Sequence, residues 1–97
     1  MKEIPPFKLI PQPLNDEAAS LPGFKWASPV IGTRHRLGGK PEFIQGDETP
    51  RCSCGDVMTF YAQLDSVSPE FNLADGGMIY VFVCFGCFET KAILQSS

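Results

Sequence analysis

Two stretches of the chain carry the hydrophobic patterns of β-strands. In residues 57–64 apolar and polar side chains alternate, which predicts a strand with one buried face. The residues expected on that face are Met58, Phe60, Ala62 and Leu64. Residues 78–83 are apolar on both faces, which predicts a strand that is central in its sheet. The turn at residues 75–77 precedes this strand, and residues 89–95 can return as its hairpin partner.

The remaining segments predict shorter elements. Residues 42–45 are expected to form one short strand after a tight glycine turn, and Ser68-Pro69-Glu70 resembles the start of a short helix. Residues 1–31 hold six of the nine prolines, which makes a long helix improbable. We therefore expect a proline-rich arm packed on the sheet, with one possible helical turn at residues 16–19.

Four cysteines stand beside the two main strands in two close pairs. Cys52 and Cys54 precede the first strand, and Cys84 and Cys87 follow the second. Two hairpin tips can thus bring four sulfur atoms to one metal ion. We expect a structural Zn²⁺ with no open coordination position, with iron in the same geometry as the lesser competitor.

The cysteines also permit three roles that need no structural metal. They can be small buried hydrophobic residues, or they can form unrelated disulfides. A redox role for the pair Cys84 and Cys87 is disfavoured, because such a pair should open a helix and this one ends a strand.

Size and charge limit the function classes. The 97 residues, 43% hydrophobic and 20% charged, suit a single domain, with the arm at 1–31 and a β-rich metal-binding core at 32–97. The net charge of −3 argues against nucleic-acid binding, which relies on cationic contacts to phosphates. No apolar run approaches the roughly 20 residues of a membrane span, and the N-terminus lacks signal-peptide features. We expect a cytoplasmic protein, where paired cysteines bind metal more often than they form disulfides.

Outside the cysteines, the sequence offers no complete catalytic set. His35 is the only histidine, and we expect a turn residue hydrogen-bonded to backbone, because no nucleophile lies within evident reach. The pair Gly38-Gly39 lacks the Ser/Thr and the helix of a phosphate-binding loop, so a structural turn is preferred. A small enzyme that uses His35 and this glycine turn is the alternative function.

Aromatic and acidic residues near the cysteines are candidates for a partner-binding surface. Phe85 and Phe88 lie within or beside the second cysteine pair, where exposed rings would mark a contact surface. Packing beneath the metal site is the equal alternative for these two rings. Asp47 and Glu48 are expected at the rim of the surface, where acidic groups would suit a basic protein partner.

A longer segment resembles a known family. Residues 35–45, His-Arg-Leu-Gly-Gly-Lys-Pro-Glu-Phe-Ile-Gln, are similar to the H-x-[IL]-G-G-x-P-x-[WF]-[IL]-Q stretch of the YwqG-like bacterial family of unknown function. The similarity continues through both cysteine pairs and through residues 58–65 and 75–82. A related arrangement occurs in the C-terminal region of the eukaryotic programmed cell death protein 2 group. The chain departs from the family at residues 52–54, where the family usually has Cys-x-x-Cys.

The resemblance implies a β-rich domain, a metal-binding tip and no established enzymatic activity. Such domains also occur near toxin loci, which suits an immunity role. We therefore expect a mainly β fold in which two β-hairpins share a zinc-ribbon-like site. The expected function is a non-catalytic, zinc-stabilised module that binds another protein, with an immunity protein against a bacterial toxin as one specific form. Neither nucleic acid nor a membrane is an expected partner.

Overall fold

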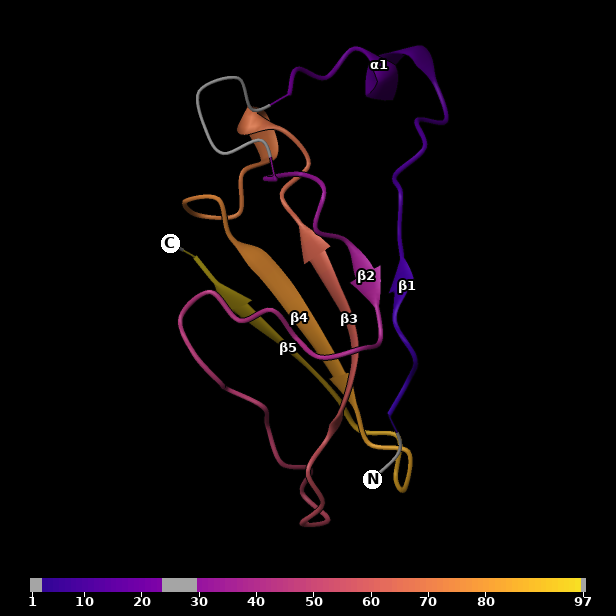
Figure 1. Cartoon of the computed structure of the whole chain (residues 1–97), viewed down its shortest axis with the longest axis vertical. Helices are drawn as coiled ribbons and strands as arrows, with labels where there is room; N and C mark the ends of the chain where they lie inside the picture. The colour runs from indigo at the N-terminus through magenta and orange to yellow at the C-terminus, as the bar shows by residue number, and fades with distance from the viewer. Residues whose placement is uncertain (1–2, 24–29, 97) are drawn as a thin grey trace.

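One antiparallel sheet is the framework of the protein (Figure 1). The computed structural model describes residues 3–23 and 30–96. Five strands lie side by side in chain order. They are β1 (Phe7–Lys8), β2 (Arg36–Leu37), β3 (Thr59–Asp65), β4 (Met78–Val83) and β5 (Thr90–Gln95). The described helices, α1 (Asp16–Ala19) and a 3₁₀-helix at Pro69–Phe71, are both far too short to cross a membrane. The mainly β fold class is confirmed.

The hairpin of β4 and β5 has the expected form. β4 pairs with β3 on one side and with β5 on the other, so it is an interior strand of the sheet. Its ladder with β5 runs from the pair Met78–Gln95 to the pair Val83–Thr90 without a register shift. The central position of residues 78–83 and the return of the chain in β5 are both confirmed.

A β-bulge in β3 changes which side chains are buried. Phe60 pairs with Phe82 and Ala62 pairs with Val81, so Tyr61 is an extra residue in the ladder. One inserted residue moves all later side chains of a strand to the opposite face. Ala62 and Leu64 therefore lie on the opposite face from the one predicted. Ala62 is buried there, as expected, but Leu64 is 42% exposed, and the polar residues Gln63 and Asp65 are buried on the core side instead.

The core lies on one face of the sheet, called the core face here. It is built from Cys52, Met58, Phe60, Met78, Tyr80, Phe82 and Cys84. Residues 41–50 cross this face on the near side in Figure 1 and cover it. The Phe43 ring packs against it, with its centroid 4.9 Å from that of Tyr80 and 6.3 Å from that of Phe82. The second layer of the fold is thus a loop.

The short strand expected at residues 42–45 is not formed. The segment lies across a sheet face, so it cannot join a ladder, and side chains satisfy its backbone instead. The Glu42 amide donates to the Gln63 side chain (3.0 Å), and the Glu42 carbonyl accepts from the Tyr80 hydroxyl (2.7 Å). The Gln45 amide donates to the Gln95 side chain (2.8 Å). Gln63 and Gln95 are both buried, so these side chains serve as internal hydrogen-bond partners of the segment.

The proline-rich arm docks at the edge of the sheet rather than across its face. β1 pairs with β2, and the Leu9 amide donates to the His35 carbonyl (3.1 Å). Residues 11–20 are exposed, and α1 is capped by Asn15, whose side chain accepts from the Ala18 amide (2.8 Å). Residues 1–2 and 24–29 of the predicted arm lie outside the described residues.

The glycine turn at residues 38–39 is shaped by this docking. Gly38 has a φ of +64°, and a Cβ atom built there would lie 2.4 Å from the Pro5 carbonyl oxygen. The Gly39 amide donates to the Ile4 carbonyl (2.7 Å). Only glycine permits both this backbone conformation and this close approach.

Candidate metal centre

Two turns at one end of the sheet present the cysteines. The first cysteine turn, residues 52–56, is closed by a single bridge between Arg51 and Val57 and by a bond from the Cys52 amide to the Asp56 carbonyl (2.8 Å). Gly55 supplies the positive φ, +96°, that this turn requires. The first hairpin is therefore shorter than expected, because no strand forms at residues 42–45.

The second cysteine turn, residues 84–89, connects β4 to β5. The Cys84 amide donates to the Glu89 carbonyl (2.9 Å), and the Phe88 amide donates to the Cys84 carbonyl (2.7 Å). Phe88 has a φ of +63°, in the left-handed region that bulky residues rarely occupy. The two turns stand next to each other because residues 51–57 lead directly into β3, the neighbour of β4.

The four sulfur atoms form one cluster in which every pair lies within 4.8 Å. Cys54 Sγ is 3.7 Å from Cys84 Sγ, and Cys52 Sγ is 2.9 Å from Cys87 Sγ. A tetrahedral ion with metal–sulfur bonds of about 2.3 Å needs sulfur–sulfur distances of about 3.8 Å. The first distance meets this value, and the second requires a small outward shift of Cys52 or Cys87. The four cysteines can therefore hold a metal ion.

The cluster lies at the boundary between the core and solvent. Cys52 and Cys84 are buried and belong to the core, whereas Cys54 and Cys87 are exposed. All four are free thiols. An ion held here would link the end of the core to the two turns, which is the position of a structural cross-link.

The protonation of the thiols is set by their closeness. Hydrogen bonds from the amides of Cys87 and Gly86 lower the pKa of Cys84 to about 7. The neighbouring sulfur of Cys52 is the main cause that raises the pKa of Cys87 to about 12. One thiolate thus forms readily, while further negative charges repel one another. A bound cation removes this repulsion and holds the remaining thiols as thiolates.

A polar clamp, formed by Ser53, Glu89 and Lys91, ties the two turns together. The Ser53 hydroxyl donates to a carboxylate oxygen of Glu89 (2.6 Å), and Lys91 Nζ lies 3.7 Å from the other oxygen. Lys91 Nζ also donates to the Arg51 carbonyl (3.0 Å). The sequence does not indicate this clamp, because its only signals are that Ser53 separates two cysteines and that Glu89 is two residues after Cys87.

The two candidate aromatic residues differ in exposure. Phe88 is 72% exposed at the second cysteine turn. Phe85 is half-buried and lines a hollow of about 540 Å³ beside the turn, together with Arg51 and Asp56. The structure therefore places the Phe88 ring in solvent and the Phe85 ring at the wall of a depression.

The two candidate acidic residues do not gather at the cysteine turns. Glu48 accepts a hydrogen bond from Gln95 Nε2 (2.5 Å), and Gln95 is at the end of β5 remote from the second cysteine turn. Asp47 accepts from the amide and the hydroxyl of Thr49 (2.9 and 2.7 Å) and stabilises a turn. The structure thus does not bring Glu48 to the rim of a surface around Phe88.

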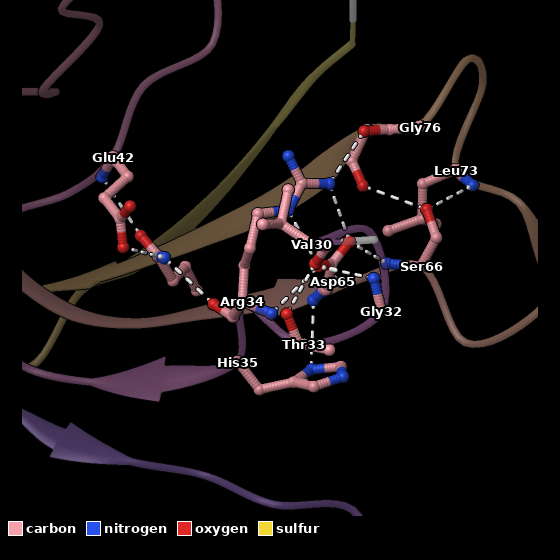
Figure 2. A network of polar contacts seen from close by, with 12 residues as sticks. Val30, Gly32, Thr33, Arg34, His35, Glu42, Asp65, Ser66, Leu73 and Gly76 are labelled. Carbon is pink, nitrogen blue, oxygen red and sulfur yellow. Dashed lines mark hydrogen bonds and ion pairs between the residues drawn. The ribbon is translucent and has the colours of Figure 1, made fainter. Parts of the chain in front are cut away.

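His35 is hydrogen-bonded to backbone, as expected, although it lies beside β2 rather than in a turn. It is 8% exposed, and its Nδ1 accepts from the Asp65 amide (3.0 Å). Figure 2 shows the ring pointing at the end of β3 from below. The imidazole thus closes the junction between β2 and β3.

Asp65 is the centre of a buried polar network that the sequence did not reveal (Figure 2). Its side chain is fully buried and accepts from the Gly32 amide (2.8 Å), the Ser66 amide (2.7 Å), and the amide and guanidinium of Arg34 (3.0 and 2.8 Å). Burial by itself would raise the pKa of Asp65, but the Arg34 guanidinium and these amides outweigh it and lower the pKa. The network anchors residues 32–34 to the end of β3.

Comparison with known proteins finds a relative of the chain but shows no family. A curated protein of Salmonella typhimurium (strain LT2) with the name "Uncharacterized protein YpfL" is 35% identical to this chain over 66 residues. The match covers 67% of this chain and 16% of the relative, so the chain spans a small part of that protein's length. No family model and no solved structure matches the chain. The resemblance to the YwqG-like family stays a prediction.

Proposed function

We propose that the chain is a non-catalytic module that binds another protein through a tip stabilised by a structural Zn²⁺. The single observation that carries the zinc assignment is the cluster of four sulfur atoms within 4.8 Å of one another. Structural zinc sites take four protein ligands, whereas catalytic zinc keeps one position for water or substrate. The four cysteines would fill every position. A reducing compartment such as the cytoplasm suits such a site, because it keeps thiols free for metal.

The conformation of Phe88 supports the binding role. In the first cysteine turn, Gly55 directly follows the second cysteine and has a φ of +96°, and in the second turn Phe88 has the corresponding place with a φ of +63°. A bulky residue in this region costs on the order of 1–3 kcal/mol, and glycine would avoid that cost. The ring is 72% exposed, so it does not recover the cost by packing in the core. An exposed aromatic ring on a strained, metal-held turn is well placed as an anchor for a partner.

The charge of the chain favours a basic partner. The net charge is −3, and complementary potentials raise the association rate of two proteins. A basic toxin would meet this condition, so the immunity protein is a special case of the proposal. Asp47 and Glu48 lie apart from the cysteine turns, so they would act on such a partner through the overall field rather than as a rim around Phe88.

The experiment is a quantitative pull-down from host lysate with wild-type protein, Phe88→Gly and the control Phe71→Ala. Phe71 is 56% exposed on the 3₁₀-helix, so the control removes a similar ring elsewhere. We expect Phe88→Gly to lose a specific partner while its zinc content stays the same and its melting temperature rises slightly, because glycine relieves the strain. A partner that Phe88→Gly retains in full, with Phe71→Ala equally unchanged, would contradict the proposal.

A further inference from the structure

The sheet has a second face, called the outer face here, that carries no charged side chain in any of the five strands and is apolar except for Thr59 and Thr90. The register places Phe7, Leu37, Ala62, Val81 and Ala92 in one row across it. Because the core side chains point to the other face, this row belongs to the face opposite Tyr80 and Phe82. Contacts between the described elements join only neighbouring strands, so no described helix or strand lies on the outer face.

The bulge at Tyr61 creates this apolar surface. Without the inserted residue, Gln63 and Asp65 would share a face with the outer row, and Ala62 and Leu64 would point to the core. With it, Leu64 joins Ile79 and Leu94 in a second apolar row of the outer face. The charged residues of the strands then lie on the core-face side of the register: Lys8, Arg36, Asp65 and Lys91.

Much of the outer face is exposed. Phe7 is 55%, Leu64 42% and Leu94 52% exposed, while Ile79 and Val81 in the middle of the sheet are half-buried and Ala62 is buried. Antiparallel sheets with one solvated face normally carry polar side chains there. A face without charge over five strands is instead typical of a layer that packs against another layer.

We infer that the outer face binds a second copy of this chain, so that two sheets pack face to face around a twofold axis. Two sheets with the same hand of twist pack in an aligned sandwich, at about 30° and about 10 Å apart. A second copy of the chain has a sheet with the same twist as the first. Its outer face also carries no charged side chain, so no ionised group is desolvated when the two faces meet.

The size of the face sets the strength of the dimer. Strands about 4.8 Å apart, with up to six residues of about 3.3 Å each, give a footprint of about 350–500 Å² per copy. The dimer would bury about 700–1,000 Å² in total, which is below the roughly 1,200–2,000 Å² of stable interfaces and in the range of weak, transient ones. The dimer should therefore be weak and depend on concentration. It is independent of the tip proposed for partner binding, because Phe88 lies in the turn beyond the ends of β4 and β5.

The test is sedimentation equilibrium of the full chain with its metal, from about 10 µM to about 1 mM. We expect a monomer–dimer equilibrium that tightens at higher salt, because salt screens the repulsion between two chains of charge −3 and does not weaken apolar contacts. Leu94→Glu should weaken the dimer at least about tenfold, because it places two charges in the interface. Val67→Glu is the control, since Val67 is 59% exposed outside the strands.

A second variant protects the test against misfolding. Ala92→Glu places the charge in the other row, at an exposed position, and should weaken the dimer to the same extent. It replaces Leu94→Glu as the test variant if that protein does not fold. A monomer throughout the concentration range would overturn the inference. So would a dimer that both outer-face variants keep, or an outer face that is protected from hydrogen exchange only when a different protein is added.

Discussion

Replacement of Asp65 by Asn should be among the most damaging single changes in this chain. Asn keeps the shape of the side chain but loses the charge, and its amide NH₂ would face groups that are themselves donors. The Asp65 side chain has no exposure, and that of Arg34 has 19%. Removing one partner of a buried ion pair typically costs about 3–5 kcal/mol, and the partial solvation of Arg34 favours the lower end, about 3 kcal/mol.

The assay is urea unfolding at pH 7, followed by circular dichroism at constant zinc concentration. The expected loss is about 3 kcal/mol in the free energy of unfolding, which in a thermal melt of a domain of this size corresponds to a fall of about 12–24 °C in melting temperature. Asp47→Asn is the matched control, because Asp47 is an exposed carboxylate that only caps a local turn, and it should change the free energy of unfolding by less than about 0.5 kcal/mol. A loss below about 1 kcal/mol for Asp65→Asn would refute the view that this network holds residues 32–34 to β3.

The same carboxylate gives the protein a defined response to acid. The pKa of Asp65 is lowered in the folded state, so its contribution is complete above the pKa of the unfolded chain and is lost as pH falls through the folded pKa. Wild-type protein should therefore lose stability in that acidic window, and Asp65→Asn should lose less there. Parallel acid dependence in the two proteins would show that Asp65 is not the responsible group.

Three further changes test other parts of the structure. Gly38→Ala should release the arm from the sheet, because its Cβ would lie 2.4 Å from the Pro5 carbonyl oxygen. Limited proteolysis should then cut the arm faster than in the wild type. The control Gly23→Ala, whose Cβ would meet nothing within 4 Å, should leave the rate of cleavage unchanged. Glu89→Gln should lower zinc affinity by up to about tenfold in a chelator competition, with Glu70→Gln at an exposed position as the control. Equal affinities in the two variants would show that the clamp does not support zinc binding. Cys84→Ser should abolish stoichiometric zinc binding and the cooperative melt, and a full zinc load in this variant would exclude Cys84 as a ligand.

The parts of the fold that could be predicted are those with a local signal. Residues 78–83 are apolar at both faces, and the structure places them inside the sheet as β4. The cysteine pairs were expected to meet because each adjoins a strand, and their sulfur atoms form one cluster. In both cases short-range sequence pattern and tertiary structure agree.

The parts that could not be predicted depend on residues far apart in the sequence. The alternation in residues 57–64 gives no sign of the bulge, which brings Asp65 to Arg34 and Gln63 to Glu42 on the core face. The segment at 42–45 has the composition of a strand, but its backbone partners are side chains of Gln63, Tyr80 and Gln95. Such long-range pairing leaves no periodicity in the sequence.

Zinc K-edge X-ray absorption on protein purified without chelator would identify the atoms bound to the metal. We expect four sulfur neighbours at about 2.3 Å and no nitrogen or oxygen bound directly to the metal. The donors would be the thiolates of Cys52, Cys54, Cys84 and Cys87. Fewer than four sulfur atoms, a water ligand, or a folded protein without zinc would contradict the closed structural site.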